Sequence, residues 1–129
     1  MNLRLSKAAG YAIHALHYMH KMNSAKPIMV REIAEHLQLP YDSVLKVLRQ
    51  MAKARLVTAH RGSKGGFSLR KPGGEITFLD VIEIIDGPLD AEHHPVVKGS
   101  HGKPIANDIL VEATSQLKKL LSRGTIDAI

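Results

Sequence analysis

The sequence predicts a mainly α-helical protein with one small β-hairpin, and three observations lead to this fold class. Residues 30–70 have the pattern of a helix, a short turn, a second helix and a basic, glycine-rich hairpin. Near the C-terminus, apolar residues recur in steps of four and three, which is the spacing of a coiled-coil helix. The 129 residues fit one domain with an appended helical arm.

A first helix is expected from Ser6, a typical N-cap residue, to about Asn23. One side of this helix is apolar and is formed by Ala8, Ala12, Ala15, Leu16 and Met19. The other side carries His14, His17 and His20. We interpret these histidines as a solvated face, and the alternative is that two of them share a metal ion.

Two further helices are expected over residues 30–37 and from Pro40, tolerated in a first turn, to about Ala54. Ala34 is small enough for the two helices to approach closely, and Gln38 occupies the turn position that often holds glycine. The shared core of this helix pair is predicted to contain Ile33, Leu37, Leu39, Val44 and Val47.

Residues 56–59 and 67–69 are expected to pair as antiparallel strands, because the segment HRGSKGG between them has the glycine content of a hairpin. Beyond the hairpin, Thr77 is a predicted N-cap, and Asp80 completes a capping box. The helix over residues 78–86 should end at Gly87, which is followed by a proline.

Residues 89–103 show no periodicity and are predicted to form a loop. The last helix is expected to begin at Pro104 and to end near Ser122. Its heptad-spaced side predicts a dimer interface made of Ala106, Leu110, Ala113, Leu117 and Leu120.

The net charge of +6 is unevenly distributed along the chain. Residues 1–72 contain 13 Lys and Arg against three Asp and Glu, a balance of +10, whereas residues 73–129 contain five against nine, a balance of −4. A basic half and an acidic half orient a molecule toward a polyanion, so the charge pattern favours nucleic acid as a partner.

Together these features predict a winged helix-turn-helix that binds double-stranded DNA. At the start of the third helix, Tyr41, Asp42 and Ser43 are expected to reach base edges. Lys46 and Arg49, further along, are expected to contact phosphates or guanine. The alternative for all five residues is an ordinary solvated helix face.

In the predicted wing, Arg61 is placed to enter a narrow minor groove, and Lys64 to bind phosphate. The wing glycines would let the backbone approach DNA closely, and they are Gly62, Gly65 and Gly66. His60 could assist in this contact or be an exposed surface histidine. Lys7, at the start of the first helix, is a further candidate phosphate contact.

The chain contains no cysteine, so disulfides, thiolate metal sites and a cysteine-ligated iron–sulfur cluster are excluded. The predicted loop holds candidate metal ligands, namely His93, His94 and His101, although their spacing matches no metal signature and exposed histidines are the alternative. No catalytic motif stands out, so an enzyme is not expected. No apolar run could cross a membrane and no signal peptide is present, which predicts a cytoplasmic protein. No cofactor is predicted.

The ordered combination of GYAIHAL, REIAEHLQLPYDSVLKVLRQMAKARLV, RGSKGGFSLRKP and EITFLDVIEIIDGP resembles a family of small bacterial winged-helix transcriptional regulators. That family includes the iron–sulfur regulator IscR, the nitric-oxide sensor NsrR and the cysteine-metabolism regulator CymR. The resemblance covers nearly the whole chain. It implies a homodimer, joined largely through the last helix, that binds a roughly palindromic promoter site and usually represses. Many members carry three cysteines in the loop before the dimer helix, and this chain has none there.

On this basis residues 1–76 are predicted to form the winged helix-turn-helix domain. Residues 77–129 would hold the following helix, a sensor-type loop over 89–103 and the dimerisation helix. Two refinements stay open at this point. The histidine loop could sense a metal or haem, or the protein could respond to a small molecule or to a protein partner docked on an apolar patch around Val96 and Val97.

Overall fold

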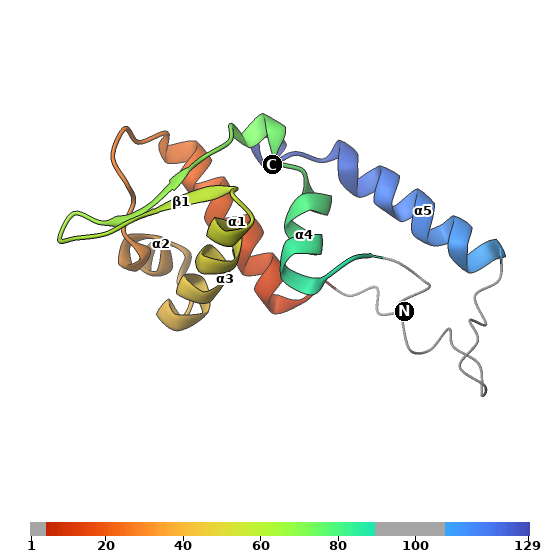
Figure 1. Ribbon diagram of the computed structural model, residues 1–129, viewed down its shortest axis with the longest axis horizontal. Helices are drawn as coiled ribbons and strands as arrows, with labels where there is room; N and C mark the ends of the chain where they lie inside the picture. Colours follow the sequence, from red (N-terminus) through yellow and green to blue (C-terminus); the bar gives the residue numbers. More distant parts are fainter. Residues whose placement is uncertain (1–4, 90–107) are drawn as a thin grey trace.

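The computed structural model describes residues 5–89 and 108–129, and the side chains of 108–110 are outside its description. Four helices and a hairpin form the body, and a long final helix leaves it at one side (Figure 1). The predicted fold class, mainly helical with a two-stranded antiparallel wing, is confirmed. Within the described part of the chain, no helix is long and apolar enough to cross a membrane.

The first helix, α1 (Lys7–Met22), begins and ends as the sequence predicts. The Ser6 hydroxyl accepts a hydrogen bond from the Ala9 N–H at 3.0 Å, so one of the free amides of the first turn is satisfied. Asn23 ends the helix in the left-handed conformation, with φ at 42°. On the apolar side of α1, Ala12, Ala15, Leu16 and Met19 are buried, and Ala8 is half-buried.

The helix-turn-helix consists of α2 (Val30–Leu37) and α3 (Tyr41–Lys53). Gln38 has a φ of 55° and donates its N–H to the helix carbonyls before it, so a glutamine serves where glycine is common. Pro40 is the N-cap of α3 and not a first-turn residue as expected. The predicted shared core is confirmed: Ile33, Ala34, Val44 and Val47 are buried, and Leu37 and Leu39 pack against them half-buried.

The wing is formed by β1 (Val57–His60) and β2 (Gly66–Leu69), which pair from Val57 opposite Leu69 to His60 opposite Gly66. Both strands differ by one residue from the predicted limits. β1 starts later because the Leu56 N–H still bonds to the Met51 carbonyl at the end of α3, at 3.0 Å. Ile28, from the connection between α1 and α2, forms an additional bridge to Phe67 of β2.

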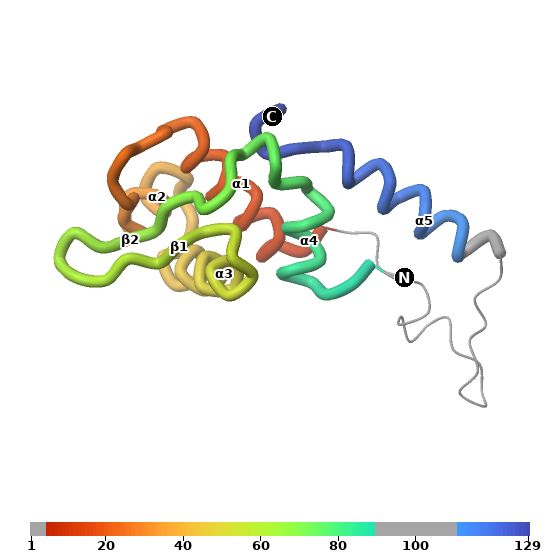
Figure 2. Tube along the Cα trace, turned by 45° about the horizontal axis from the view of Figure 1, so that its top comes forward, coloured from red at the N-terminus to blue at the C-terminus, as the bar shows by residue number. Residues whose placement is uncertain are grey.

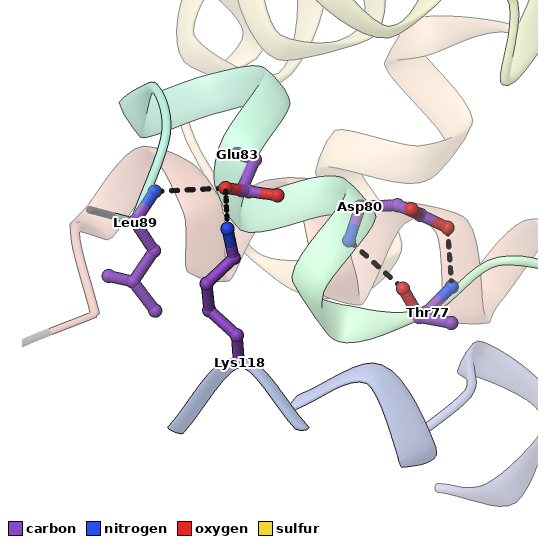
Figure 3. A network of polar contacts seen from close by, with 5 residues as sticks. All are labelled: Thr77, Asp80, Glu83, Leu89 and Lys118. Atoms are coloured by element: carbon purple, nitrogen blue, oxygen red, sulfur yellow. Dashed lines mark hydrogen bonds and ion pairs between the residues drawn. The ribbon is translucent and has the colours of Figure 1, made fainter. Parts of the chain in front are cut away.

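After the wing come a short 3₁₀ turn, η1 (Gly73–Glu75), and then α4 (Phe78–Asp86). The predicted capping box is present: the Thr77 hydroxyl accepts from the Asp80 N–H, and the Asp80 carboxylate accepts from the Thr77 N–H, both at 3.0 Å (Figure 3). Gly87 ends α4 at a φ of 88°, as the Gly-Pro signal predicts.

The last helix, α5 (Asp108–Arg123), ends one residue later than predicted, and its expected start at Pro104 lies outside the described residues. It is followed by η4 (Ile126–Ala128), which returns to the body beside η1 (Figure 1). The Ile126 N–H donates to the Ile76 carbonyl, and the Phe78 N–H donates to the Gly124 carbonyl, both at 3.0 Å. Ile126 itself is fully buried.

The hydrophobic core therefore extends through α1, the helix-turn-helix, the wing, α4 and η4. It contains Val81 and Ile126 in the same buried cluster as Leu16 and Leu48. The division at residue 76 stays a prediction, and this cluster contains side chains from both sides of it.

The predicted solvated histidine face of α1 is wrong for two of its three members. His14 is exposed, but His17 and His20 are half-buried, because η4 and η1 pack against this side of the helix. The His17 Nδ1 lies 3.2 Å from the Ile126 carbonyl oxygen, and the His20 ring lies against Gly73. Both side chains therefore help to hold the C-terminal turn and η1.

Tyr18 joins α1 to α2 by a polar contact at the edge of the core. Its hydroxyl donates to Glu32 at 2.9 Å, and its ring lies 4.6 Å from the His36 ring, centroid to centroid. Burial, with the Glu32 carboxylate beside the hydroxyl as a lesser cause, raises the pKa of the Tyr18 phenol. The protonated phenol is thus the form that the fold stabilises.

We expect Tyr18→Phe to lower the free energy of unfolding at pH 7 by about 1 kcal/mol, the usual contribution of such a hydrogen bond. Since the folded pKa lies above the unfolded value, the contribution is complete below about pH 10 and is lost as the pH rises through the folded value. Urea unfolding of both proteins at pH 7, 9 and 10.5 measures this. A difference between them that stays constant at every pH would contradict it.

Candidate nucleic-acid interface

A groove lies between the helix-turn-helix and the wing. This groove has a volume of about 1050 Å³. One wall is formed by α2 and α3, and the other by the hairpin, with Phe67 at its base. The polar side chains that line it are Arg31, Glu35, Gln38, Tyr41, Arg49, His60, Arg61 and Ser63. Arginines therefore line the groove from both walls, Arg31 and Arg49 from the helices and Arg61 from the hairpin.

On α3, the structure separates the five predicted contacts into two groups. Tyr41 and Arg49 line the groove, and Tyr41 is 49% exposed at the first position of the helix. The other three are outside the groove: Asp42 and Lys46 are exposed and Ser43 is half-buried. At the start of α3, the side chains of Tyr41 and Asp42 are therefore accessible to a ligand.

In the wing, Arg61 and Gly62 line the groove and are exposed, as is Lys64, which is outside the groove. The His60 Nε2 lies 2.8 Å from the Ser68 hydroxyl, on the neighbouring strand. This contact fixes the imidazole at the foot of the turn that carries Arg61. His60 is thus exposed and also held by the hairpin.

The fold itself requires glycine at three positions of the wing. A Cβ on Gly66 would lie 2.2 Å from the Ile28 carbonyl oxygen, and the residue has a φ of 148°. A Cβ on Gly65 would lie 2.4 Å from the His60 carbonyl oxygen. Gly62 differs, because its φ of 101° requires glycine while the space around it is open. Gly65 and Gly66 allow the hairpin to close, and Gly62 allows its tip to turn.

Sequence reasoning missed Arg31. It is exposed at the second position of α2, between the buried Val30 and Ile33, and it faces the same groove as Arg49 and Arg61. A signal was available, since a cation in the first turn of a helix opposes the helix dipole and is more often placed for a ligand than for stability. The structure also places Glu35 in the groove as its one carboxylate.

Lys7 lies apart from these residues. It is exposed in the first turn of α1, next to the point where the Ser6 hydroxyl donates to Asp86 at the end of α4, at 2.6 Å. The hairpin, which lines the groove, is at the opposite end of the body from the start of α1 (Figure 1). A contact from Lys7 to the same ligand stays a prediction.

The candidate metal ligands His93, His94 and His101, like Val96 and Val97, lie outside the described residues. Among the residues that are described, no group of three or more His, Cys, Asp or Glu side chains is placed to hold a metal ion. The alternative of a metal on the histidines of α1 therefore has no support in the fold.

A three-helix core, a tight turn and a two-stranded hairpin define a winged helix-turn-helix protein. The chain belongs to the Rrf2 family, whose description is "Iron-dependent Transcriptional regulator" and whose model matches residues 5–129. The resemblance stated from the sequence is thus confirmed. A family of transcriptional regulators also agrees with the expectation that the protein is not an enzyme.

Relatives and solved structures agree with this assignment. A protein of Mycobacterium tuberculosis described as an HTH-type transcriptional regulator is 34% identical over 87 residues, which are 67% of this chain and 54% of the relative. One from Aquifex aeolicus is 35% identical over 79 residues, 61% of this chain and 54% of the relative. The chain thus spans about half the length of the curated relatives it matches.

Two solved structures show the same fold. CymR, the global cysteine regulator of B. subtilis, superimposes with a TM-score of 0.79 at 23% identity, covering 98% of this chain and 96% of CymR. The IscR of T. potens gives a TM-score of 0.73 at 20% identity, covering 99% of this chain and 87% of that one.

The iron in the family description does not fit this chain as a cysteine-ligated cluster. Such clusters are held by thiolates, and the sequence has no cysteine. The described residues hold no alternative group of ligands. No part of the function proposed below passes through a metal.

We expect Gly66→Ala to destabilise the protein by about 2 kcal/mol or more, because the new methyl group must push Ile28 away from the wing and the φ is unfavourable as well. Gly62→Ala is the matched control: it has unfavourable φ but open space, so about 1 kcal/mol is expected. Chemical denaturation of both variants measures the difference. Equal losses would show that the close contact with Ile28 is unimportant.

Proposed function

We propose that this protein is a sequence-specific DNA-binding transcriptional regulator that acts as a homodimeric repressor on a palindromic promoter site. The observation that carries the proposal is the groove between α3 and the wing, with arginines on both walls. A recognition helix and a wing contact neighbouring grooves of one duplex, and the phosphate backbone between those grooves would then lie against this concave surface.

In this arrangement each predicted residue has a separate role. The N-terminal turn of α3 enters the major groove, where Tyr41 and Ser43 meet base edges and Asp42 accepts from cytosine N4 while repelling phosphate. Arg61 enters the minor groove from the exposed tip of the wing. The backbone between them is bound by cations, from within the groove and around it, namely Arg31, Lys46, Arg49 and Lys64.

The dimer is proposed to form through α5. One side of this helix packs on α4, where Thr114 is buried and Lys118 lies 3.8 Å from Glu83 (Figure 3). The heptad-spaced side of α5 is more accessible. Ala113 and Leu120 are exposed, Leu120 by 60%, and Leu117 is half-buried. Ala106 and the side chain of Leu110 lie outside the described residues.

A second copy of the chain is the occupant that the heptad spacing of this side favours, since a coiled-coil seam pairs with a like seam. Two reading heads related by a two-fold axis would require an operator with matching half-sites. A dimer bound across a promoter would exclude polymerase, which makes repression the proposed sign of regulation. Such a regulator works where the chromosome is, in the cytoplasm.

We expect Arg61→Ala and Arg31→Ala each to weaken binding to a selected DNA site by about 1 kcal/mol or more. Arg31→Ala should also lower the slope of log K against log salt by about 0.9, since one phosphate contact is lost. Fluorescence anisotropy at several salt concentrations measures both effects. Lys53→Ala is the matched control, because Lys53 is exposed at the end of α3 and outside the groove.

If both arginine variants bind the selected site with the affinity and salt dependence of the Lys53→Ala protein, the groove is not the DNA-binding surface. Retained binding by Arg31→Ala with loss by Arg61→Ala would limit the interface to α3 and the wing. One set of titrations distinguishes these two results.

We expect Leu120→Asp to shift the protein from dimer to monomer, because a carboxylate on the heptad side of α5 would be buried without a partner, at a cost of about 2 kcal/mol or more. Ser115→Asp adds the same charge to the same helix at an exposed position off that side and should leave the dimer intact. Sedimentation velocity over a range of concentrations measures the shift. A dimer that tolerates both substitutions must be formed elsewhere.

A further inference from the structure

A second cavity lies on the other side of the wing from α3. It has a volume of about 630 Å³ and is enclosed by the end of α1, the connection from α1 to α2, the end of β2, η1 and η4. Figure 2 shows these segments gathered above β2, with the C-terminal turn beside them. It shares only Phe67 with the groove between α3 and the wing, so the two cavities are separate sites that meet at this residue of β2.

The rim of this cavity is strongly basic. Lys26, Arg70 and Lys71 are exposed and come from two segments that are distant in the sequence. Asp127, on η4, is the one carboxylate that lines it. Three cations against one anion make the cavity attractive to a negatively charged group, and the concave shape concentrates their field.

The floor of the cavity is apolar. Met19, Ile28 and Phe67 line it, and all three are buried, with exposed fractions between 2% and 6%. Small-molecule sites commonly combine such an apolar floor with a few charged groups that fix orientation. A long nucleic-acid backbone would use the cations and would have no use for the floor.

The walls are fixed by close contacts. A Cβ on Gly73 would lie 2.6 Å from the His20 Nδ1, so the backbone of η1 lies directly against the imidazole. A Cβ on Gly74 would lie 3.0 Å from an Asp127 carboxylate oxygen, so η1 also contacts η4. Ile28 and Phe67 exchange two backbone hydrogen bonds, of 2.8 and 2.9 Å. The cavity is thus present before any ligand binds.

We propose that this cavity binds a small organic anion with one or more carboxylate or phosphate groups and a compact apolar part. Lys26, Arg70 and Lys71 hold the acid groups, and the apolar part lies over Phe67 and Met19. The Asp127 carboxylate would repel an acid group placed beside it, so it favours the orientation in which the acid groups of the ligand lie at the three cations. A regulatory role for the bound anion rests on the proposed DNA-binding function. Binding of the anion to the cavity can be measured without DNA.

The test uses the full chain and phenyl phosphate as the probe, because this molecule has one acid group and one compact apolar ring. Inorganic phosphate, which has the acid group alone, is the matched second anion, and ionic strength is held constant. Amide NMR titration should show saturable shifts at Gly73, Gly74 and the end of β2 for phenyl phosphate. Arg70→Ala combined with Lys71→Ala should weaken phenyl phosphate binding about tenfold or more. Lys21→Ala combined with Lys53→Ala removes two exposed cations outside the cavity and should leave affinity within about twofold.

Asp127→Asn is expected to change the affinity in the opposite direction, so it separates a lost contact from a lost fold. Removing the carboxylate should strengthen phenyl phosphate binding by about threefold. An affinity for inorganic phosphate equal to that for phenyl phosphate would identify a bare anion site and overturn the role of the floor. Shifts spread over all basic surfaces, unchanged by the double variant, would overturn the site itself.

The remaining occupant is DNA that flanks the operator. If the Arg70 and Lys71 double variant weakens DNA binding as much as Arg61→Ala, while phenyl phosphate causes no saturable shift, the cavity is part of the DNA surface and the proposal is wrong. That result would leave the proposed function intact. If the wild type shows no sequence-specific DNA binding, the proposed function is refuted, and the phenyl phosphate result is unaffected.

Discussion

The bridge between Ile28 and Phe67 is the interaction on which both cavities, the groove at α3 and the basic cavity, depend. Its two backbone hydrogen bonds attach the wing to the connection between α1 and α2. Phe67 is the single residue that lines both described cavities, so the groove at α3 and the basic cavity meet at this residue. A two-stranded ribbon is marginally stable alone, and this third attachment lets four-residue strands hold Arg61 in place. Gly66 is required because no side chain fits beneath the bridge.

A second attachment joins the last helix to the same body. Ile126 is buried in the core, bonded to Ile76, and its carbonyl lies beside His17. Since η4 follows α5 after two residues, the C-terminal end of the proposed dimer helix is fixed to α1. At the other side, Glu83 of α4 accepts from the Leu89 N–H at 2.9 Å and pairs with Lys118 (Figure 3). The relative position of two reading heads would therefore be determined by core packing rather than by a flexible linker.

The sequence predicted what local chemistry determines. The limits of α2 and α4 were correct because their signals lie within a few residues: the Thr77 and Asp80 box, and the Gly87 end. The wing was predicted from two strand-like segments and the glycines between them, but the limits of its strands were not, since the start of β1 depends on the bond from the Leu56 N–H to the Met51 carbonyl in α3. Contacts between distant segments were missed. The packing of His17 and His20 depends on residues more than fifty positions away. The place of Arg31 opposite the wing depends on hairpin residues 28 to 36 positions away. Periodicity within one helix carries no information about either.

Because the two cavities share Phe67 of β2, a ligand that regulates DNA binding from the basic cavity must meet one requirement. A ligand in the basic cavity changes DNA affinity only if it binds two arrangements of the wing unequally, because equal affinity shifts no equilibrium. Contact with Phe67 supplies the means, since this side chain is a wall of both cavities. An anion that touched the exposed cations alone would occupy the site without altering the wing. An effective ligand must therefore reach the apolar floor, and for this reason the proposal requires an apolar part as well as an acid group.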